Sequence, residues 1–335
     1  MRESALPLNY NLSTLGADFD TIQDWNANRV EGVDLVGNMA GEVLYIPPGT
    51  YSDLTPVSLE DTNKPQTSDD DYFPLIIGEP DNKPHLQFKD LEAQIGIGTS
   101  LNHAARLCDL MVSVESEFSV AIMAGIYSNV SHTLVQGCVV KDMISPGAFY
   151  AACAFLSWNP VHFVNCATDA SGTVDVGSDQ IAAFLAFTNS LLYNFTTSNS
   201  GYDIGMAITS GTLNAYNCVV QNADSPTSGT VNQTTCAINQ GLLFDTDGYT
   251  LLTDDRGNGT DLSSDPTCPF SDDIFGSARS PGQWERGASI YTTLSESEDP
   301  DAGSRHYVGL PSRIARPSLS QIVNTNLSTR LTRRS

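Results

Sequence analysis

The sequence predicts an all-β protein built as a parallel β-solenoid, with a cap before the solenoid and an extended arm after it. Short apolar segments recur about every 30 residues through the middle of the chain. Turn-forming Gly, Asn, Ser, Asp and Pro separate them, and none has the pattern of an amphipathic helix of 10–12 residues. Two independent series of segments share this period. Repeats of this kind bury their apolar faces by stacking on one another.

The first series is aligned on a Cys or Phe that recurs at intervals of 30, 28, 29 and 23 residues. These anchors are Cys108, Cys138, Cys166, Phe195 and Cys218. The residue before the anchor is Asn in three consecutive copies, at positions 165, 194 and 217. Equivalent residues of stacked strands lie about 4.8 Å apart. We therefore expect a Cys/Phe stack inside and an Asn stack at a bend, because Asn tolerates the left-handed backbone conformation.

The second series consists of short strand-like segments with the same period. Its members are residues 120–124, 151–155, 181–185, 204–208 and 235–238. The alternative interpretation is an ordinary β-sandwich whose spacing is accidental. Two series with one period favour the solenoid over that alternative.

The two ends of the chain differ from the repeats, so the predicted organisation is a cap (1–70), a solenoid (71–290) and an arm (291–335). Residues 21–26 form a short amphipathic pattern with Ile22 and Trp25 on one face, typical of a helix that covers the first repeat. Residues 43–51 follow as a strand that ends in a Pro-Gly turn.

Three segments carry a resemblance to a known family: Gly16–Trp25, Ile46–Tyr51, and Asp261–Pro266 followed by Trp284–Ala288. They resemble segments of right-handed parallel β-helix proteins, the pectate-lyase-like superfamily, in its viral and environmental branch. The resemblance covers about residues 16–290. It implies a single-stranded right-handed parallel β-helix. It says little about activity, because this fold hosts lyases, hydrolases, adhesins and inert virion parts.

Composition excludes several classes of function. The chain has 335 residues, 39 acidic and 16 basic side chains, and a net charge of −23. Nucleic acid and anionic membranes repel such a body, and no apolar run reaches the roughly 20 residues that span a bilayer. The first seven residues carry no apolar signal-peptide core. No phosphate-binding or nucleophile-elbow motif occurs, and no cofactor is expected.

Seven cysteines are present, an odd number, and none forms a CxxC pair. A metal cluster or a scaffold held by disulfides is therefore not expected. Most of the cysteines lie in apolar runs, which favours small buried hydrophobic side chains over reactive nucleophiles.

The resemblance implies two kinds of catalytic site. Lyases of this superfamily use a calcium-binding acidic cluster with Arg or Lys as base, and hydrolases use several Asp residues on adjacent repeats. The candidates here are Asp142, Asp169 and Asp203, and Lys141 beside Asp142 is an adjacent base–acid pair. Their offsets from the anchors differ, so the alternative interpretation is that each is a solvated loop residue.

Two sets of residues are of types that bind metal ions. Asp254, Asp255 and Asp261 lie in a loop that resembles a calcium loop but lacks its final Glu. His103, His132 and His162 follow the repeat period. Their offsets from the anchors also differ, which favours turn or surface positions.

The last segment reverses the charge of the chain. Residues 301–335 carry a net charge of +5, whereas residues 1–300 carry −28. Its arginines alternate with apolar residues, a pattern typical of a segment that lies along another surface. The predicted docking residues are Arg313, Arg316, Arg330, Arg333 and Arg334. We expect this surface to belong to the acidic body of the chain, to another subunit or to another protein.

These observations lead to an expected function as a structural protein of a tailed virus or phage, exposed as a head decoration, fibre or spike. A virion protein is made in the host cytoplasm and needs no signal peptide. Expected partners are other copies, by analogy a homotrimer, other virion proteins through residues 305–335, and a cell-surface glycan. The alternative is a polysaccharide lyase or glycoside hydrolase on a tail spike. A non-viral adhesin would require an export signal.

Overall fold

The computed structural model describes residues 8–10, 18–19, 43–54, 57–59, 75–90, 95–99, 106–128, 134–178 and 181–291. All of them belong to one compact unit. A second unit, residues 34–39 and 293–335, lies outside the described residues. The described residues contain strands and loops and no helix. The strands form three sheets, named A, B and C below.

Sheet A has ten strands, and from β3 onward every neighbouring pair is parallel. In spatial order they are β2 (Asp18–Phe19), β1 (Leu8–Tyr10), β3 (Val43–Tyr45), β6 (Leu75–Ile77), β9 (Arg106–Cys108), β12 (Leu134–Gln136), β15 (His162–Val164), β19 (Ser190–Tyr193), β22 (Leu213–Tyr216) and β25 (Val231–Thr234). Strand β1 pairs antiparallel with both β2 and β3.

Sheet B is parallel throughout. Its strands are β4 (Thr50–Leu54), β7 (His85–Asp90), β10 (Met111–Ser116), β13 (Val139–Ser145), β16 (Ala167–Thr168), β20 (Thr196–Thr197), β23 (Val219–Val220) and β26 (Ala237–Ile238), with β17 (Val174–Val176) paired to β13.

Sheet C is also parallel. Its strands are β5 (Val57–Leu59), β8 (Ile95–Thr99), β11 (Val120–Ser128), β14 (Ala148–Ser157), β18 (Ala182–Ala186), β21 (Ile204–Ile208) and β24 (Ser225–Ser228).

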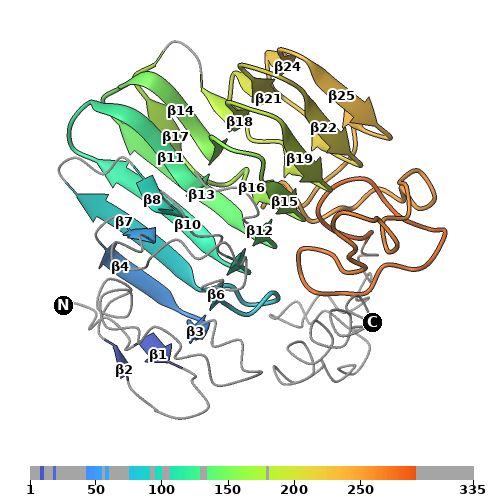
Figure 1. Ribbon diagram of the computed structural model, residues 1–335, viewed down its shortest axis with the longest axis horizontal. Helices are drawn as coiled ribbons and strands as arrows, with labels where there is room; N and C mark the ends of the chain where they lie inside the picture. Colours follow the sequence, from blue (N-terminus) through green and yellow to red (C-terminus); the bar gives the residue numbers. More distant parts are fainter. Residues whose placement is uncertain are drawn as a thin grey trace, which may run out of the picture. The chain divides into compact units, whose positions relative to one another are not determined.

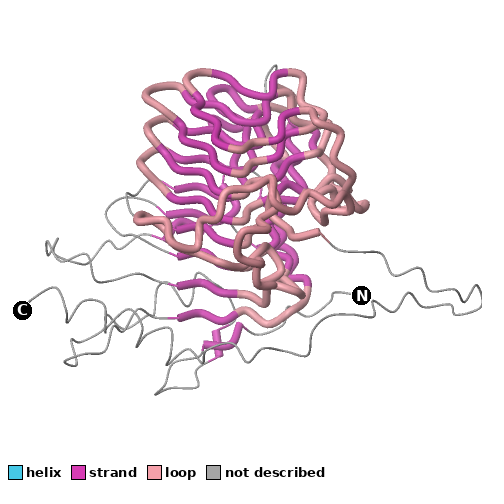
Figure 2. Tube along the Cα trace, turned by 90° about the vertical axis from the view of Figure 1, so that its right-hand side faces the viewer, coloured by secondary structure: helices cyan, strands magenta, loops and turns pink. Residues whose placement is uncertain are grey.

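From β3 to β26 the chain visits sheets A, B and C in rotation, and β17 is one additional strand of sheet B. One passage through the three sheets is called a repeat here. Each strand therefore pairs with its equivalents in the preceding and following repeats. Figure 1 shows β11, β14 and β18 side by side, and Figure 2 shows strands of successive repeats stacked on one another. The predicted all-β class and the predicted parallel pairing of repeats are confirmed.

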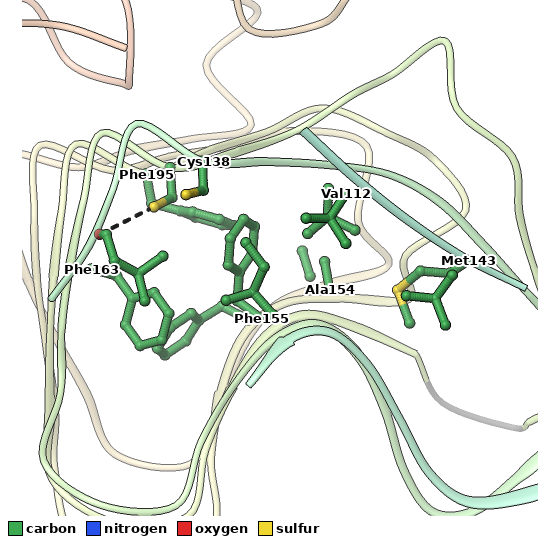
Figure 3. Close-up of a cluster of buried hydrophobic side chains, with 14 of the residues drawn as sticks. Val112, Cys138, Met143, Ala154, Phe155, Phe163 and Phe195 are labelled. Atoms are coloured by element: carbon green, nitrogen blue, oxygen red, sulfur yellow. Dashed lines mark hydrogen bonds between the residues drawn. The ribbon is translucent and has the colours of Figure 1, made fainter. Parts of the chain in front are cut away.

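The main core lies between the three sheets, because alternate residues of each strand point inward. Four aromatic rings form its centre. Phe155 of sheet C contacts Phe163 of sheet A edge to face, with ring centroids 6.0 Å apart, and Phe195 at 5.8 Å. Phe163 also contacts Phe184 at 4.9 Å. Figure 3 shows Phe155, Phe163 and Phe195 beside Cys138, with Val112 and Met143 farther along the same core.

The predicted Asn stack occupies left-handed positions at the bend between sheets A and B. Asn165, Asn194 and Asn217 have φ values of 51°, 51° and 53°. The residue after each of them is buried in the core. In the earlier repeats Asp109 and Gly137 take the same position, with φ of 59° and 65°. The predicted reason for Asn at this bend is thus confirmed.

Two details of the predicted alignment are wrong. Cys108 pairs with Gln136, so the residue equivalent to Cys138 is Leu110, two positions later. The expected anchor was displaced because Asp109, not Asn, precedes Leu110 at the bend. In addition, residues 235–238 do not continue sheet C. Their strand, β26, pairs with β23 in sheet B, because the last repeat is much shorter than the others.

Residues 239–291 also differ from expectation, since they contain no strand and only two isolated bridges, Phe244 with Leu251 and Asp272 with Ala278. This stretch is called the C-terminal segment below. The predicted cap helix at 21–26 lies outside the described residues. Within the described part of the chain, no helix has the length and apolarity needed to cross a membrane.

Candidate functional site

The C-terminal segment covers part of the outer faces of sheets A and B. Leu262 and Trp284 pack on Val164 and Tyr193 of sheet A. A second set of apolar residues, Tyr249, Ile274 and Ala288, packs on Val139 and Ala167 of sheet B. These strand residues point away from the main core, so the segment builds additional cores on the outside of two sheets.

Buried charged groups fix the C-terminal segment in place. The guanidinium of Arg279 is buried and donates to the carbonyls of Asp272, Glu285, Gly287 and Ala288, at 2.8 to 3.2 Å. Its guanidinium carbon lies 5.4 Å from the ring centroid of Trp284. Burial lowers the pKa of Arg279, and the carboxylates of Asp273 and Glu285 oppose that shift. The backbone carbonyls of this segment thus accept hydrogen bonds from one side chain instead of from a neighbouring strand.

The Asn stack also binds this segment. The amide of Asn165 donates to the carbonyl of Asp272 at 2.9 Å. Asn217 donates to the carbonyl of Thr260 at 2.8 Å and accepts from the Thr260 N–H at 2.7 Å. Asn194 lies between them and donates to Asn165 at 3.0 Å. The sequence predicted the stack, but these contacts were missed because the segment has no periodic pattern.

The carboxylates of the predicted calcium loop lie in this segment and serve different partners. Asp255 is buried and accepts two bonds from the guanidinium of Arg286, at 2.6 and 2.8 Å, and a third from its backbone N–H at 3.0 Å. Asp254 is exposed and binds Arg256, whose hydrogen bond lowers the pKa of Asp254 to about 2. Asp261 accepts from the N–H of Ser263 at 2.9 Å. Among the described residues no three His, Cys, Asp or Glu side chains are placed to hold a metal ion.

A polar row crosses three repeats on the outer face of sheet B. His85 Nε2 lies 2.7 Å from Ser113 Oγ, and Ser113 Oγ donates to Asp142 Oδ2 at 2.8 Å. Because the serine proton goes to the carboxylate, His85 Nε2 carries the hydrogen and donates to Ser113. A register shift between β10 and β13, opposite Ser113, brings this carboxylate into the row.

The surroundings of the row favour a neutral imidazole. Burial lowers the pKa of His85, and the nearby ammonium of Lys141 lowers it further. Asp142 and Asp169 act in the opposite direction but do not outweigh burial. The row and its neighbours Lys141 and Asp169 are called the polar patch below. This patch combines an uncharged imidazole, a hydroxyl, one cation and two carboxylates.

The structure places Asp142 and Asp169 of the predicted catalytic set near His85. Besides Ser113, Asp142 accepts from the N–H of Thr173 at 2.8 Å. Asp169 is buried and accepts from the N–H and hydroxyl of Ser171 at 2.8 and 2.6 Å. Asp203 precedes β21 of sheet C and accepts from the N–H of Ile181 at 2.9 Å. Each carboxylate thus stabilises a loop or strand end.

The outer face of sheet C carries a separate apolar cluster over four repeats. Ala124, Cys153, Leu156, Ala182 and Ala207 are its buried members. Half-buried side chains surround them, namely Ile122, Tyr127, Trp158, Leu185, Phe187 and Ile204. Trp158 and Phe187 stack with ring centroids 3.8 Å apart and planes inclined by 6°. Sequence reasoning missed this face because strands apolar on both sides show no alternation.

The remaining predicted site residues are placed in part. His162 lies in β15, whereas His103 and His132 lie outside the described residues. The five docking arginines, Arg313, Arg316, Arg330, Arg333 and Arg334, also lie outside the described residues.

Comparison with known proteins adds no relative. No family model matches the chain, and no curated protein or solved structure matches it.

Proposed function

We propose that the body of the chain is a single right-handed parallel β-helix. The rotation of consecutive strands through three parallel sheets supports this architecture. Right-handed connections between parallel strands of one sheet are strongly favoured, because the strand twist directs the chain that way. The resemblance of residues 16–290 to β-helix proteins supports the same assignment.

The function proposed for this β-helix is structural, as an exposed part of a tailed-virus particle: a head decoration, fibre or spike. The observation that carries it is the apolar outer face of sheet C. Large contiguous apolar faces mark contacts between proteins. The C-terminal segment packs on outer apolar residues of sheets A and B, whereas the apolar cluster of sheet C contains no residue of that segment. This difference favours sheet C as the face for assembly.

The proposed occupant of the sheet C face is a second copy of the chain. Flat lateral faces that repeat along a β-helix suit packing about a rotation axis. The β-helix spikes that the chain resembles are homotrimers, which favours three copies. Residues 305–335 are proposed to dock on another virion protein, and glycan contact is proposed through exposed repeat faces.

Immunogold electron microscopy tests this proposal. An antibody against residues 16–290 is applied to particles purified from the source culture. We expect label on particle heads for a decoration protein, or at tail tips for a receptor-binding spike. Stringently washed particles that contain the protein by mass spectrometry but bind no gold would contradict its exposed position. Particles free of the protein by both measurements would overturn the virion proposal.

A second candidate function is polysaccharide cleavage, which the polar patch of His85, Lys141, Asp142 and Asp169 favours. The patch places a neutral imidazole, a cation and two carboxylates together on an outer sheet face, and these are group types used in acid–base cleavage. A depolymerase assay on host capsule polysaccharide tests it. If the patch is catalytic, Asp142→Asn lowers the rate at least 100-fold, whereas Asp175→Asn, at an exposed site, leaves it unchanged. Absence of cleavage by the unmodified protein removes this candidate.

A further inference from the structure

Two cysteines face each other in the last two repeats. Tyr216 pairs with Thr234 and Val219 with Ala237, so Cys218 lies opposite Cys236. Parallel neighbours of this kind are about 4.8 Å apart. Disulfides join Cα atoms that are about 4.4–6.8 Å apart. The backbone spacing therefore suits a disulfide without movement of either strand.

The side chains of this pair are in contact. The N–H of Cys218 donates to Cys236 Sγ at 3.4 Å. The neighbouring Cys218 side chain lowers the pKa of Cys236. Burial opposes this shift, whereas backbone hydrogen bonds and the charge of Arg286 add to it. Burial raises the pKa of Cys218 well above its ordinary value. The pair thus combines a partly exposed cysteine, whose pKa is lowered, with a buried cysteine beside it.

A second cysteine pair in the same fold provides an internal comparison. Val139 pairs with Ala167, so Cys138 lies opposite Cys166 with the same stacking geometry. Both of these thiols are fully buried, and burial raises the pKa of each. Neither can meet a dissolved oxidant while the protein is folded. The two pairs share the stacking geometry, but only the Cys218–Cys236 pair has a member that is partly exposed to solvent.

We propose that Cys236 is an oxidation site and that it forms a disulfide with Cys218. The Cys236 thiolate attacks a small disulfide such as oxidised glutathione, the S–S bond of the reagent breaks, and one glutathione thiol leaves. Cys218 then loses its proton and attacks Cys236 Sγ, and the second glutathione leaves. Two protein thiols are oxidised, and one reagent disulfide is reduced to two thiols.

The position of this bond gives it a structural effect. Strands β25 and β26 are the last strands of sheets A and B. In these sheets the last repeat therefore pairs with a neighbouring described strand on one side only. Stacked repeats lose order from their ends, because a terminal repeat has one interface instead of two. A covalent link between the last two repeats restrains that loss. The link closes a loop of 18 residues.

The test uses the full-length protein, purified with reductant and equilibrated with oxidised glutathione. We expect a mass loss of about 2 Da, a fall from seven reactive thiols to five in denaturant, and a non-reducing peptide map that joins Cys218 to Cys236. We expect the oxidised protein to unfold several degrees higher than the reduced protein. A linked Cys138–Cys166 peptide, or seven thiols after equilibration, would overturn the proposal.

Two variants sharpen the test. Cys236→Ser keeps the size of the side chain and should retain its six thiols in the oxidising buffer. Cys268→Ser, the matched control at another partly exposed cysteine, should still lose two thiols and about 2 Da. Loss of two thiols from Cys236→Ser would assign the reaction to other cysteines and contradict the proposal. If this variant does not fold, the peptide map of the unmodified protein decides the question.

Discussion

In the C-terminal segment, buried charged side chains form hydrogen bonds with backbone groups that would be paired between strands in a sheet. Arg279 pairs four backbone carbonyls, and the carboxylate of Asp273 accepts from the N–H groups of Phe275, Ser277 and Ile290. The buried Asp255 and the partly buried Arg286 form a further ion pair at 2.6 Å. An irregular backbone needs such partners, because buried polar groups without hydrogen bonds are costly.

Arg279→Met tests this dependence. The substitution keeps an apolar chain of similar length. It leaves four carbonyls without their donor and removes the positive charge beside Asp273 and Glu285. We expect a loss of about 3–5 kcal/mol in the free energy of unfolding, measured by urea denaturation. Arg256→Met, which removes an exposed pair, should change it by less than about 1 kcal/mol. Equal effects of the two substitutions would contradict the role of Arg279.

The polar row predicts a pH dependence. His85 has a lowered pKa in the folded protein relative to 6.5 in the unfolded chain, because of burial and Lys141, against Asp142 and Asp169. The unfolded chain therefore binds the proton more readily, and stability present above pH 6.5 is lost as the pH falls through the folded value. Urea denaturation at pH 7.5 and 5.5 should show a smaller difference for His85→Gln than for the unmodified protein. An unchanged difference would contradict this assignment.

At the scale of elements, the sequence pattern predicted the repeats well where they are regular. Asn165, Asn194 and Asn217 mark one bend because left-handed backbone favours Asn. The first repeat was misaligned because Asp109 replaces Asn there. The patch around His85 was missed because a register shift in β13 changes the offset of Asp142. The irregular C-terminal segment could not be predicted, since long-range contacts and not local period determine its path.

The bend and the C-terminal segment are coupled through Asn217. Asn217→Ala removes two bonds to Thr260 and places alanine, which tolerates the left-handed conformation less well than Asn, at a φ of 53°. We expect destabilisation of about 2–4 kcal/mol and faster proteolysis within residues 239–291. Asn232→Ala, at an exposed position on β25, serves as control and should leave the cleavage rate within about twofold. Faster cleavage elsewhere, with the segment intact, would contradict the coupling.

At the scale of the whole molecule, the proposed assembly depends on sheet C. Leu185→Asp places a charge in the middle of its outer apolar face, where the side chain is half-buried. We expect the variant to remain folded and to elute as a monomer, measured by light scattering after size-exclusion chromatography. Leu243→Asp, on the C-terminal segment with 66% of the residue exposed, should retain the oligomer. A monomeric unmodified protein would contradict the proposed trimer.

The shortening of the repeats bears on how such molecules avoid forming fibres. Equivalent residues are 29 apart between Asn165 and Asn194, but 18 apart between Asn217 and Thr235. The last strand of sheet A, β25, is short, and its Asn232, Gln233 and Thr234 are exposed and polar. A narrow polar end is a poor template for the wider first repeats of another molecule. The taper therefore disfavours end-to-end polymerisation and leaves lateral association as the route for the proposed assembly.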